Sequence, residues 1–194
     1  MARYINNYLI SHSTSGRKTF YKWLNTIFNK VDEQRIKEVG ADRAAAEWLL
    51  RCGASVKWKN KKDWVSDYNV MQIEFVLQNV IEEIDASESC IMHIGFPYLR
   101  GLKYLERIKF YKCIYLEDTC LSMLSVLKNS LQHLEVISCG NVSDKGIISL
   151  SQLKKLKSLY LNDLPEVKDK EDCLNLLQQN LPGCKIEFHR LPET

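Results

Sequence analysis

The chain has 194 residues, of which 45% are hydrophobic and 26% are charged, a composition that excludes an intrinsically disordered protein. Its net charge of +3 arises from 27 basic and 24 acidic residues, and so balanced a charge predicts no nucleic-acid partner. The seven cysteines form no Cys-x-x-Cys pair, which argues against a zinc ribbon and a secreted disulfide framework. No apolar stretch reaches the eighteen or so residues that a membrane-spanning helix needs.

Residues 1–31 contain no Asp or Glu, although they contain five basic residues and several serines and threonines. Acid-poor segments of this kind are typical of mitochondrial import sequences, because positive charge is drawn toward the negative matrix. The pattern predicts a presequence over residues 1–19, with cleavage before Phe20. The alternative is a disordered N-terminal tail.

Residues 20–79 are predicted to form a small, mainly helical N-terminal domain. Its first segment has apolar residues at helical spacing, namely Phe20, Trp23, Leu24, Ile27, Phe28 and Val31. This helix either docks onto the rest of the protein or makes a peripheral membrane or partner contact through residues 20–31. A second helix is expected over residues 44–50, with Asp42 as its N-cap and Gly53 as its C-cap.

Aromatic residues and lysines are interleaved over residues 56–68. Such a pattern can stack on single-stranded nucleic acid, but that function usually needs a larger aromatic platform. The favoured interpretation is a short strand or cap that covers the open end of a repeat array, with its lysines in solvent.

Residues 80–194 repeat one unit with the pattern L-x-x-L-x-L. The five rows are Ile81/Ile84/Ala86, Leu105/Ile108/Phe110, Leu131/Leu134/Val136, Leu156/Leu159/Leu161 and Leu181/Cys184/Ile186. Their starts are 24, 26, 25 and 25 residues apart, and alternation within each row predicts a short strand. The expected fold is therefore α/β, a short leucine-rich-repeat solenoid of four to five repeats of about 25 residues behind the helical N-terminal domain.

The residues that follow two of the rows resemble each other. Cys113 and Cys139 occupy the inward turn position where such repeats use Asn or Cys, which predicts a structural role. Asp118 and Asp144 are expected to cap the helices behind the strands.

Solenoids of this kind bind partners along their strands. Alternation predicts a mixed, mildly aromatic binding surface made of Asp85, Ser87, Lys109, Tyr111, Glu135, Ile137, Tyr160, Asn162, Lys185 and Glu187. This composition favours protein recognition. The four histidines are scattered in sequence and no Gly-rich phosphate loop is present, so no enzyme activity is expected.

Four longer strings resemble the coupling factor B family, also called ATP synthase subunit s, over residues 20–188. They are WLNTIFNKVD, VGADRAAAEWLLRCGA, IDASESCIMHIGF and ISCGNVSDKGI. The resemblance implies a peripheral protein on the matrix side of the mitochondrial inner membrane, associated with proton-driven ATP synthesis. It also implies an N-terminal domain ahead of about four repeats.

The same resemblance implies a magnesium ion held through main-chain oxygens that correspond to Gly53 and Ser87. Two protein oxygens leave most of the octahedral shell to water, so binding would be weak. The family is also associated with a Cys-x-Cys dithiol on the second repeat strand. Because Tyr111 stands at the first of these positions, only the Cys113 thiol remains, and a dithiol mechanism does not transfer to this chain.

The leading hypothesis is a non-catalytic coupling or binding factor whose partner is ATP synthase or another inner-membrane respiratory complex. The first alternative is an assembly factor for the membrane arm of respiratory complex I, since a related leucine-rich-repeat group resembles this family. A second is an F-box-like leucine-rich-repeat adaptor, although no F-box-like Leu-Pro helical motif precedes the array. A third is a thiol oxidoreductase that acts through Cys113.

Overall fold

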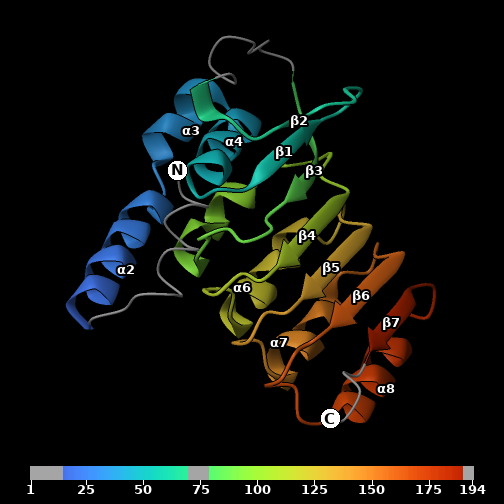
Figure 1. Cartoon of the computed structure of the whole chain (residues 1–194). Coiled ribbons are helices and arrows are strands. Elements are labelled where there is room, and N and C mark those ends of the chain that lie inside the picture. Colours follow the sequence, from blue (N-terminus) through green and yellow to red (C-terminus); the bar gives the residue numbers. More distant parts are fainter. Residues whose placement is uncertain (1–14, 70–78, 190–194) are drawn as a thin grey trace.

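The computed structural model describes residues 15–69 and 79–189, with side chains described from residue 20 onward. Residues 1–14 of the predicted presequence lie outside the described residues, as do residues 70–78 of the predicted N-terminal domain. The described chain has an α/β fold, in which one sheet carries helices along one face (Figure 1).

The chain begins with helices and a short hairpin and continues as strands that alternate with short helices. The N-terminal part contains α2 (Ser15–Asn29), α3 (Glu33–Val39), α4 (Ala41–Arg51), β1 (Ser55–Trp58) and β2 (Trp64–Val65). Strands then alternate with short helices: β3 (Ile81–Asp85), η1 (His93–Leu99), β4 (Arg107–Tyr111), α6 (Asp118–Met123), η2 (Leu124–Leu127), β5 (His133–Ile137), α7 (Asp144–Ser149), η3 (Leu150–Gln152), β6 (Ser158–Asn162), α8 (Lys170–Asn180) and β7 (Lys185–His189).

All of these strands join one sheet in the order β2-β1-β3-β4-β5-β6-β7. Strands β3 to β7 are parallel, whereas β1 runs antiparallel to both β2 and β3. One inward-facing residue of each parallel strand lies in a common cross-strand row, made of Ile84, Ile108, Leu134, Leu159 and Ile186, of which the first four are buried and Ile186 is half-buried. The predicted rows are therefore confirmed for the first four parallel strands.

The predicted last row is wrong by two residues. Ile186 lies opposite Leu159, and Phe188 lies opposite Leu161, so Ile186 takes the position assigned to Cys184. A turn around Pro182 lengthens the connection between α8 and β7, and Leu181 at its start is buried. Because the shift is even, the same side chains still face outward.

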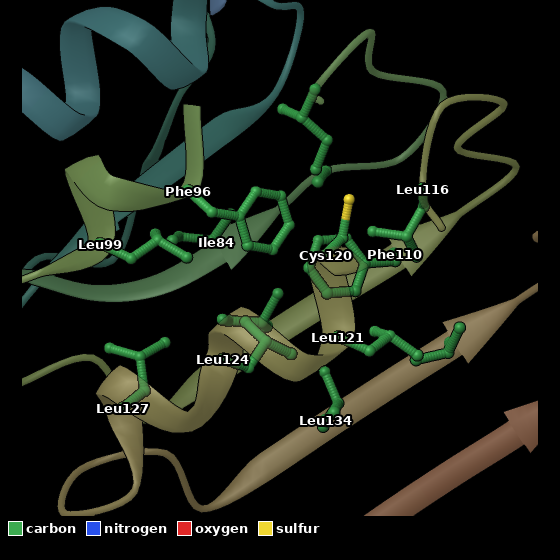
Figure 2. Close-up of a cluster of buried hydrophobic side chains, with 14 of the residues drawn as sticks. Ile84, Phe96, Leu99, Phe110, Leu116, Cys120, Leu121, Leu124, Leu127 and Leu134 are labelled. Atoms are coloured by element: carbon green, nitrogen blue, oxygen red, sulfur yellow. The ribbon is translucent and has the colours of Figure 1, made fainter. Parts of the chain in front are cut away.

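The core is continuous from the N-terminal helices to the last strand. Figure 2 shows how it is built in one unit, with Ile84 and Phe110 from neighbouring strands beside Phe96 of η1 and Leu121 of α6. In the N-terminal part, the ring of Trp48 stacks on that of Tyr98 with centroids 5.5 Å apart. The N-terminal helices and the strand array therefore share one hydrophobic core.

The helix over residues 44–50 forms as predicted, but its N-cap does not. Helix α4 begins after Gly40, and the carboxylate of Asp42 accepts a hydrogen bond from the backbone N–H of Ile81 at 2.8 Å. Asp42 thus ties α4 to the start of β3. Partial burial raises the pKa of the Asp42 carboxylate, because removal from water disfavours its charged form.

Asp118 and Asp144 also have a different role from the predicted one. Both are the first residues of their helices, and neither is an N-cap. Asp118 accepts hydrogen bonds from the backbone N–H and the hydroxyl of Ser143, and Asp144 accepts from the backbone of Lys168 and Asp169. Each carboxylate therefore joins its own turn to the turn of the next unit.

Candidate functional site

The outward face of the sheet brings together the residues predicted for a partner surface. Asp85 lies opposite Lys109, Lys109 opposite Glu135, and Glu135 opposite Tyr160. Glu187 continues this row on β7. All five side chains are half-buried, and the strand spacing of about 4.8 Å brings neighbouring side chains of opposite charge close together.

A second row runs along the carboxyl ends of the strands. Tyr111, Ile137, Asn162 and His189 lie opposite one another on β4 to β7. The ring of Tyr111 has the ammonium groups of Lys109 and Lys112 at 5.9 Å and 5.1 Å from its centroid. These contacts hold two of the predicted surface residues, Lys109 and Tyr111, against each other.

A third row was missed by the sequence analysis. Glu83 forms ion pairs with Lys57 at 2.7 Å and with Arg107 at 3.3 Å, and His133 lies opposite Arg107. The Nδ1 atom of His133 is 2.7 Å from the hydroxyl of Ser158. The alternation could have revealed this row, because it lies two residues upstream of the predicted surface in β3 to β6. Its residue on β7, Lys185, was already part of that surface.

Partial burial lowers the pKa of His133, and the positive charges of Arg107 and Lys157 lower it further. The imidazole is therefore neutral at neutral pH. The outward face combines acidic, basic, aromatic and amide side chains in register, which suits the recognition of a folded partner surface. Its use by a partner stays a prediction.

Gly53 and Ser87 lie on adjacent chain segments at one end of the sheet. Ser55 is opposite Asp85 in the antiparallel pair of β1 and β3, and continuing this register by two residues places Gly53 opposite Ser87. The backbone N–H of Cys90 donates to the carbonyl of Cys52 at 2.9 Å and closes the same junction. The carboxylate of Asp85 accepts from the backbone N–H of Ser87 at 2.9 Å.

The predicted capping role of Gly53 agrees with its geometry. Gly53 has a φ of 86°, its N–H donates to the carbonyl of Leu50, and the N–H of Ala54 donates to the carbonyl of Leu49. This pair of bonds is a Schellman motif, which glycine favours because it has no Cβ. Capping and a main-chain metal contact do not exclude each other, because capping uses the N–H of Gly53 and the metal would use its carbonyl oxygen.

At the junction of β1 and β3, the carboxylate of Asp85 lies beside the backbone of Ser87, and a magnesium ion held there through main-chain oxygens stays a prediction. Within residues 15–69 and 79–189, no group of three or more His, Cys, Asp or Glu side chains is placed to hold a metal ion. That observation concerns side chains and leaves main-chain ligands untested.

Cys113 lies in a buried column at the turns after the strands. The column contains Ser89, Cys113, Cys139 and Leu164, each five residues after the common strand row, and all four are buried. The thiol of Cys113 donates to the carbonyl of Ala86 at 2.9 Å. Its interaction with Cys139 and its burial raise the pKa of the Cys113 thiol well above 9.0, so it is protonated at neutral pH.

The apolar residues that were predicted to share one face of the first helix lie in two different environments. Phe28 and Val31 pack against the core, whereas Phe20, Trp23 and Ile27 are 55%, 57% and 47% exposed. Figure 1 shows α2 beside the body of the molecule. The docking alternative is therefore confirmed for one side of the helix, and a membrane or partner contact through the exposed side stays a prediction.

One polar side chain holds α2 in place, and the sequence analysis did not single it out. Asn29 is fully buried, and its Oδ1 accepts from the indole N–H of Trp48 at 3.1 Å and from the backbone of Met92 at 2.7 Å. Its Nδ2 donates to the carbonyls of Asn25 and Cys90. The only signal in the sequence was an asparagine directly after the apolar residues Ile27 and Phe28.

A groove of about 600 Å³ opens between α2 and the turns that follow the strands. Its lining includes Lys22, Met92, Tyr115 and Glu166, and Nδ1 of His93 is 2.6 Å from a carboxylate oxygen of Glu117. No sequence pattern predicted this groove, because its walls come from separate turns that only the stacking of units brings together.

The described residues thus define a class of protein, an α/β protein of stacked strand and helix units that presents a polar sheet face suited to binding. No protein-family model matches the chain. Individual relatives do match it over most of its length.

The chain is 50% identical over 173 residues to ATP synthase subunit s, mitochondrial, of Rattus norvegicus, which covers 88% of this chain and 86% of that protein. The proteins of the same name from Bos taurus and Homo sapiens are 49% and 47% identical over 172 residues, with 87% of this chain and 86% of each relative covered. The chain belongs to the mitochondrial ATP synthase subunit s family.

A more distant relative has a different name. Distal membrane arm assembly component 2 of Drosophila melanogaster is 30% identical over 161 residues, which cover 79% of this chain and 55% of that protein. Within the described residues, no helix is both long and apolar enough to cross a bilayer.

Proposed function

We propose that this protein is a non-catalytic coupling or binding factor of the mitochondrion that associates with ATP synthase. The observation that carries the proposal is the identity of about 50% with proteins named mitochondrial ATP synthase subunit s, along nearly the whole length of both chains. The outward sheet face, with its three rows of mixed side chains, supplies the surface for such an association.

The finer assignments belong to the same proposal. Residues 80–194 form a short leucine-rich-repeat solenoid, supported by parallel strands 24 to 27 residues apart and by the buried turn column that contains Cys113 and Cys139. The protein lies peripherally on the matrix side of the inner membrane. Magnesium binds weakly through the main-chain oxygens of Gly53 and Ser87, supported by the register of β1 and β3.

The association is tested by purifying the tagged protein from mitochondria in mild detergent and quantifying the co-purified subunits of ATP synthase and of complex I. We expect enrichment of ATP synthase. Substitution Glu135→Lys on the outward sheet face should reduce that enrichment by about tenfold, because a like-charge contact at an interface is unfavourable. Glu171→Lys, which makes the same charge change on exposed α8, is the matched control.

A specific observation favours a second candidate function, the assembly of a respiratory membrane arm. It is the 30% identity with Distal membrane arm assembly component 2. Depletion of the protein followed by separation of intact respiratory complexes distinguishes the two, because an assembly factor would cause loss of complex I before any change in ATP synthase. Enrichment of complex I alone in the purification would contradict the leading proposal.

A further inference from the structure

The two edges of the parallel sheet differ in charge. The edge where the parallel strands begin carries the connections into β4, β5 and β6, which are residues 100–106, 128–132 and 153–157. The turn between β1 and β2, residues 59–63, lies at the same edge, because Trp58 at the end of β1 is opposite Ile81 at the start of β3. We call these four segments the basic edge.

The basic edge has nine basic and two acidic residues, a net charge of +7 that exceeds the +3 of the whole chain. The basic residues are Lys59, Lys61, Lys62, Arg100, Lys103, Lys128, Lys154, Lys155 and Lys157. The opposite edge, formed by residues 86–92, 112–117, 138–143 and 163–169, has two basic and five acidic residues. The molecule is therefore polarised from one end of its parallel strands to the other.

The charges of the basic edge are accessible. Eight of the nine basic residues are exposed, and Lys59 is half-buried with its ammonium group 4.3 Å from the ring centroid of Tyr104. In the part of the chain that the structure describes, the ion pairs involve other basic residues, such as Lys57, Arg107 and Lys168. The positive charge of this edge is thus left uncompensated by neighbouring side chains.

The edge is also extended. Neighbouring strands lie about 4.8 Å apart, so the five steps from β2 to β6 spread these segments along about 24 Å. Because each stacked unit contributes one segment, the charges lie in a line. A flat anionic surface can contact all of them simultaneously. Two large aromatic side chains lie at the same edge, Tyr104 at 48% and Trp64 at 44% exposure. Aromatic rings beside lysines are characteristic of proteins that contact lipid headgroups.

We propose that the basic edge is the surface by which this protein lies on a bilayer of anionic lipids, with lipid phosphates against its lysines and the rings of Tyr104 and Trp64 at headgroup level. This inference rests on the proposed peripheral membrane location. It assigns the principal lipid contact to the sheet edge instead of residues 20–31. The plane of the sheet is then roughly perpendicular to the membrane surface. Its outward face remains accessible to a protein partner.

Sedimentation with lipid vesicles tests the proposal without any other protein. The purified chain is mixed with vesicles of phosphatidylcholine alone or of phosphatidylcholine with cardiolipin. We expect binding to the cardiolipin vesicles only, with an affinity that falls as salt is added, because about 0.1 M salt screens exposed charges beyond about 10 Å. The triple variant Lys154→Glu, Lys155→Glu, Lys157→Glu should lose at least about tenfold in apparent affinity.

The matched control is Lys112→Glu, Lys145→Glu, Lys168→Glu, which makes the same change in net charge away from the basic edge. It should bind within about twofold of the unmodified protein. The variant Lys61→Glu, Lys62→Glu repeats the test at the turn between β1 and β2. Circular dichroism and the thermal midpoint establish that each variant is folded.

Three results would overturn the proposal. Equal losses in both triple variants would mean that only net charge matters, and a loss confined to Phe20→Ser, Trp23→Ser would move the contact to α2. Normal vesicle binding by the basic-edge variant, together with loss of its co-purified ATP synthase, would assign this edge to an acidic protein surface. Failure of vesicle binding leaves the ATP synthase association intact, so the two proposals fail separately.

Discussion

One residue in each unit adopts a left-handed backbone, and none of these residues is glycine. Glu88, Lys112, Ser138 and Asp163 have φ values of 55°, 52°, 53° and 51°, each one position before the buried turn column. The backbone N–H groups of the first three donate to the neighbouring strand, which holds them in this conformation. The hydrogen-bonded stacking of the units thus offsets a local cost of about 1 to 2 kcal/mol per residue.

Lys112 provides a test of this cost, because it is exposed. Lys112→Val should lower the free energy of unfolding by about 1 to 2 kcal/mol, since a β-branched side chain tolerates a positive φ poorly. Lys112→Asn should stay within about 0.5 kcal/mol, since asparagine tolerates this region. Urea denaturation measures both, and equal stability of the two variants would contradict the interpretation.

Gly95 is required by packing. A Cβ atom at this position would lie 2.5 Å from the indole ring of buried Trp48. We expect Gly95→Ala to destabilise the protein by about 2 to 3 kcal/mol, because Trp48 must shift and its hydrogen bond to Asn29 must lengthen. Gly140→Ala is the control, since nothing lies within 4 Å of its added Cβ. Thermal melting of the two variants gives the comparison.

At the scale of elements, α3 and α4 are joined by a nearly buried carboxylate. Glu47 on α4 receives hydrogen bonds from Arg35 on α3 at 2.9 Å and 2.7 Å and from Arg43 at 2.9 Å. Burial alone would raise the pKa of Glu47, but the hydrogen bonds from Arg35 and Arg43 outweigh burial and lower it below 4.5.

This lowered pKa determines how the pair of helices responds to acid. A carboxylate with a lower pKa in the folded state stabilises the protein above the unfolded pKa of about 4.5, and the contribution is lost as the pH falls through the folded pKa. We expect Glu47→Gln to cost about 1 to 2 kcal/mol at about pH 7 and less below about pH 4. Chemical denaturation across this range measures it, and a cost independent of pH would disprove the assignment.

Helix α2 shows how a single amide can position an element. Three of the four hydrogen bonds of the Asn29 side chain join α2 to Trp48 of α4 and to the chain at Cys90 and Met92, and the fourth lies within the helix. The helix is thereby fixed with Phe20, Trp23 and Ile27 facing outward. Its apolar periodicity predicted a helix, but the choice between docked and exposed sides depended on where this amide found partners.

At the scale of the whole molecule, the junction between the helical part and the strand array is where the magnesium proposal is tested. If Mg²⁺ binds with a Kd of about 1 mM, about 10 mM should raise the free energy of unfolding by about 1.4 kcal/mol and the thermal midpoint by about 3 to 5 °C. Potassium chloride at matched ionic strength is the control. An equal shift with both salts would count against a magnesium site between Gly53 and Ser87.

Much of the strand array could be predicted from the sequence because apolar side chains recur at the same position of each repeat. Inward residues such as Ile108 and Leu134, one per unit, are strongly apolar, so the first four parallel rows were in register. The last row was misplaced because Cys184 imitates the expected residue. The true position, Ile186, is decided by the length of the turn around Pro182.

The sequence by itself determined the α/β unit, its period and the alternation that places Asp85, Lys109, Glu135 and Tyr160 on one face, since these follow from local backbone geometry. Only the tertiary structure decided the contacts that join different units. It assigned Asp118 and Asp144 to neighbouring turns, paired Ser55 of β1 with Asp85 of β3, and gathered scattered lysines along one sheet edge. Such contacts arise from the stacking of units, and stacking brings together residues about 25 positions apart that no local pattern relates.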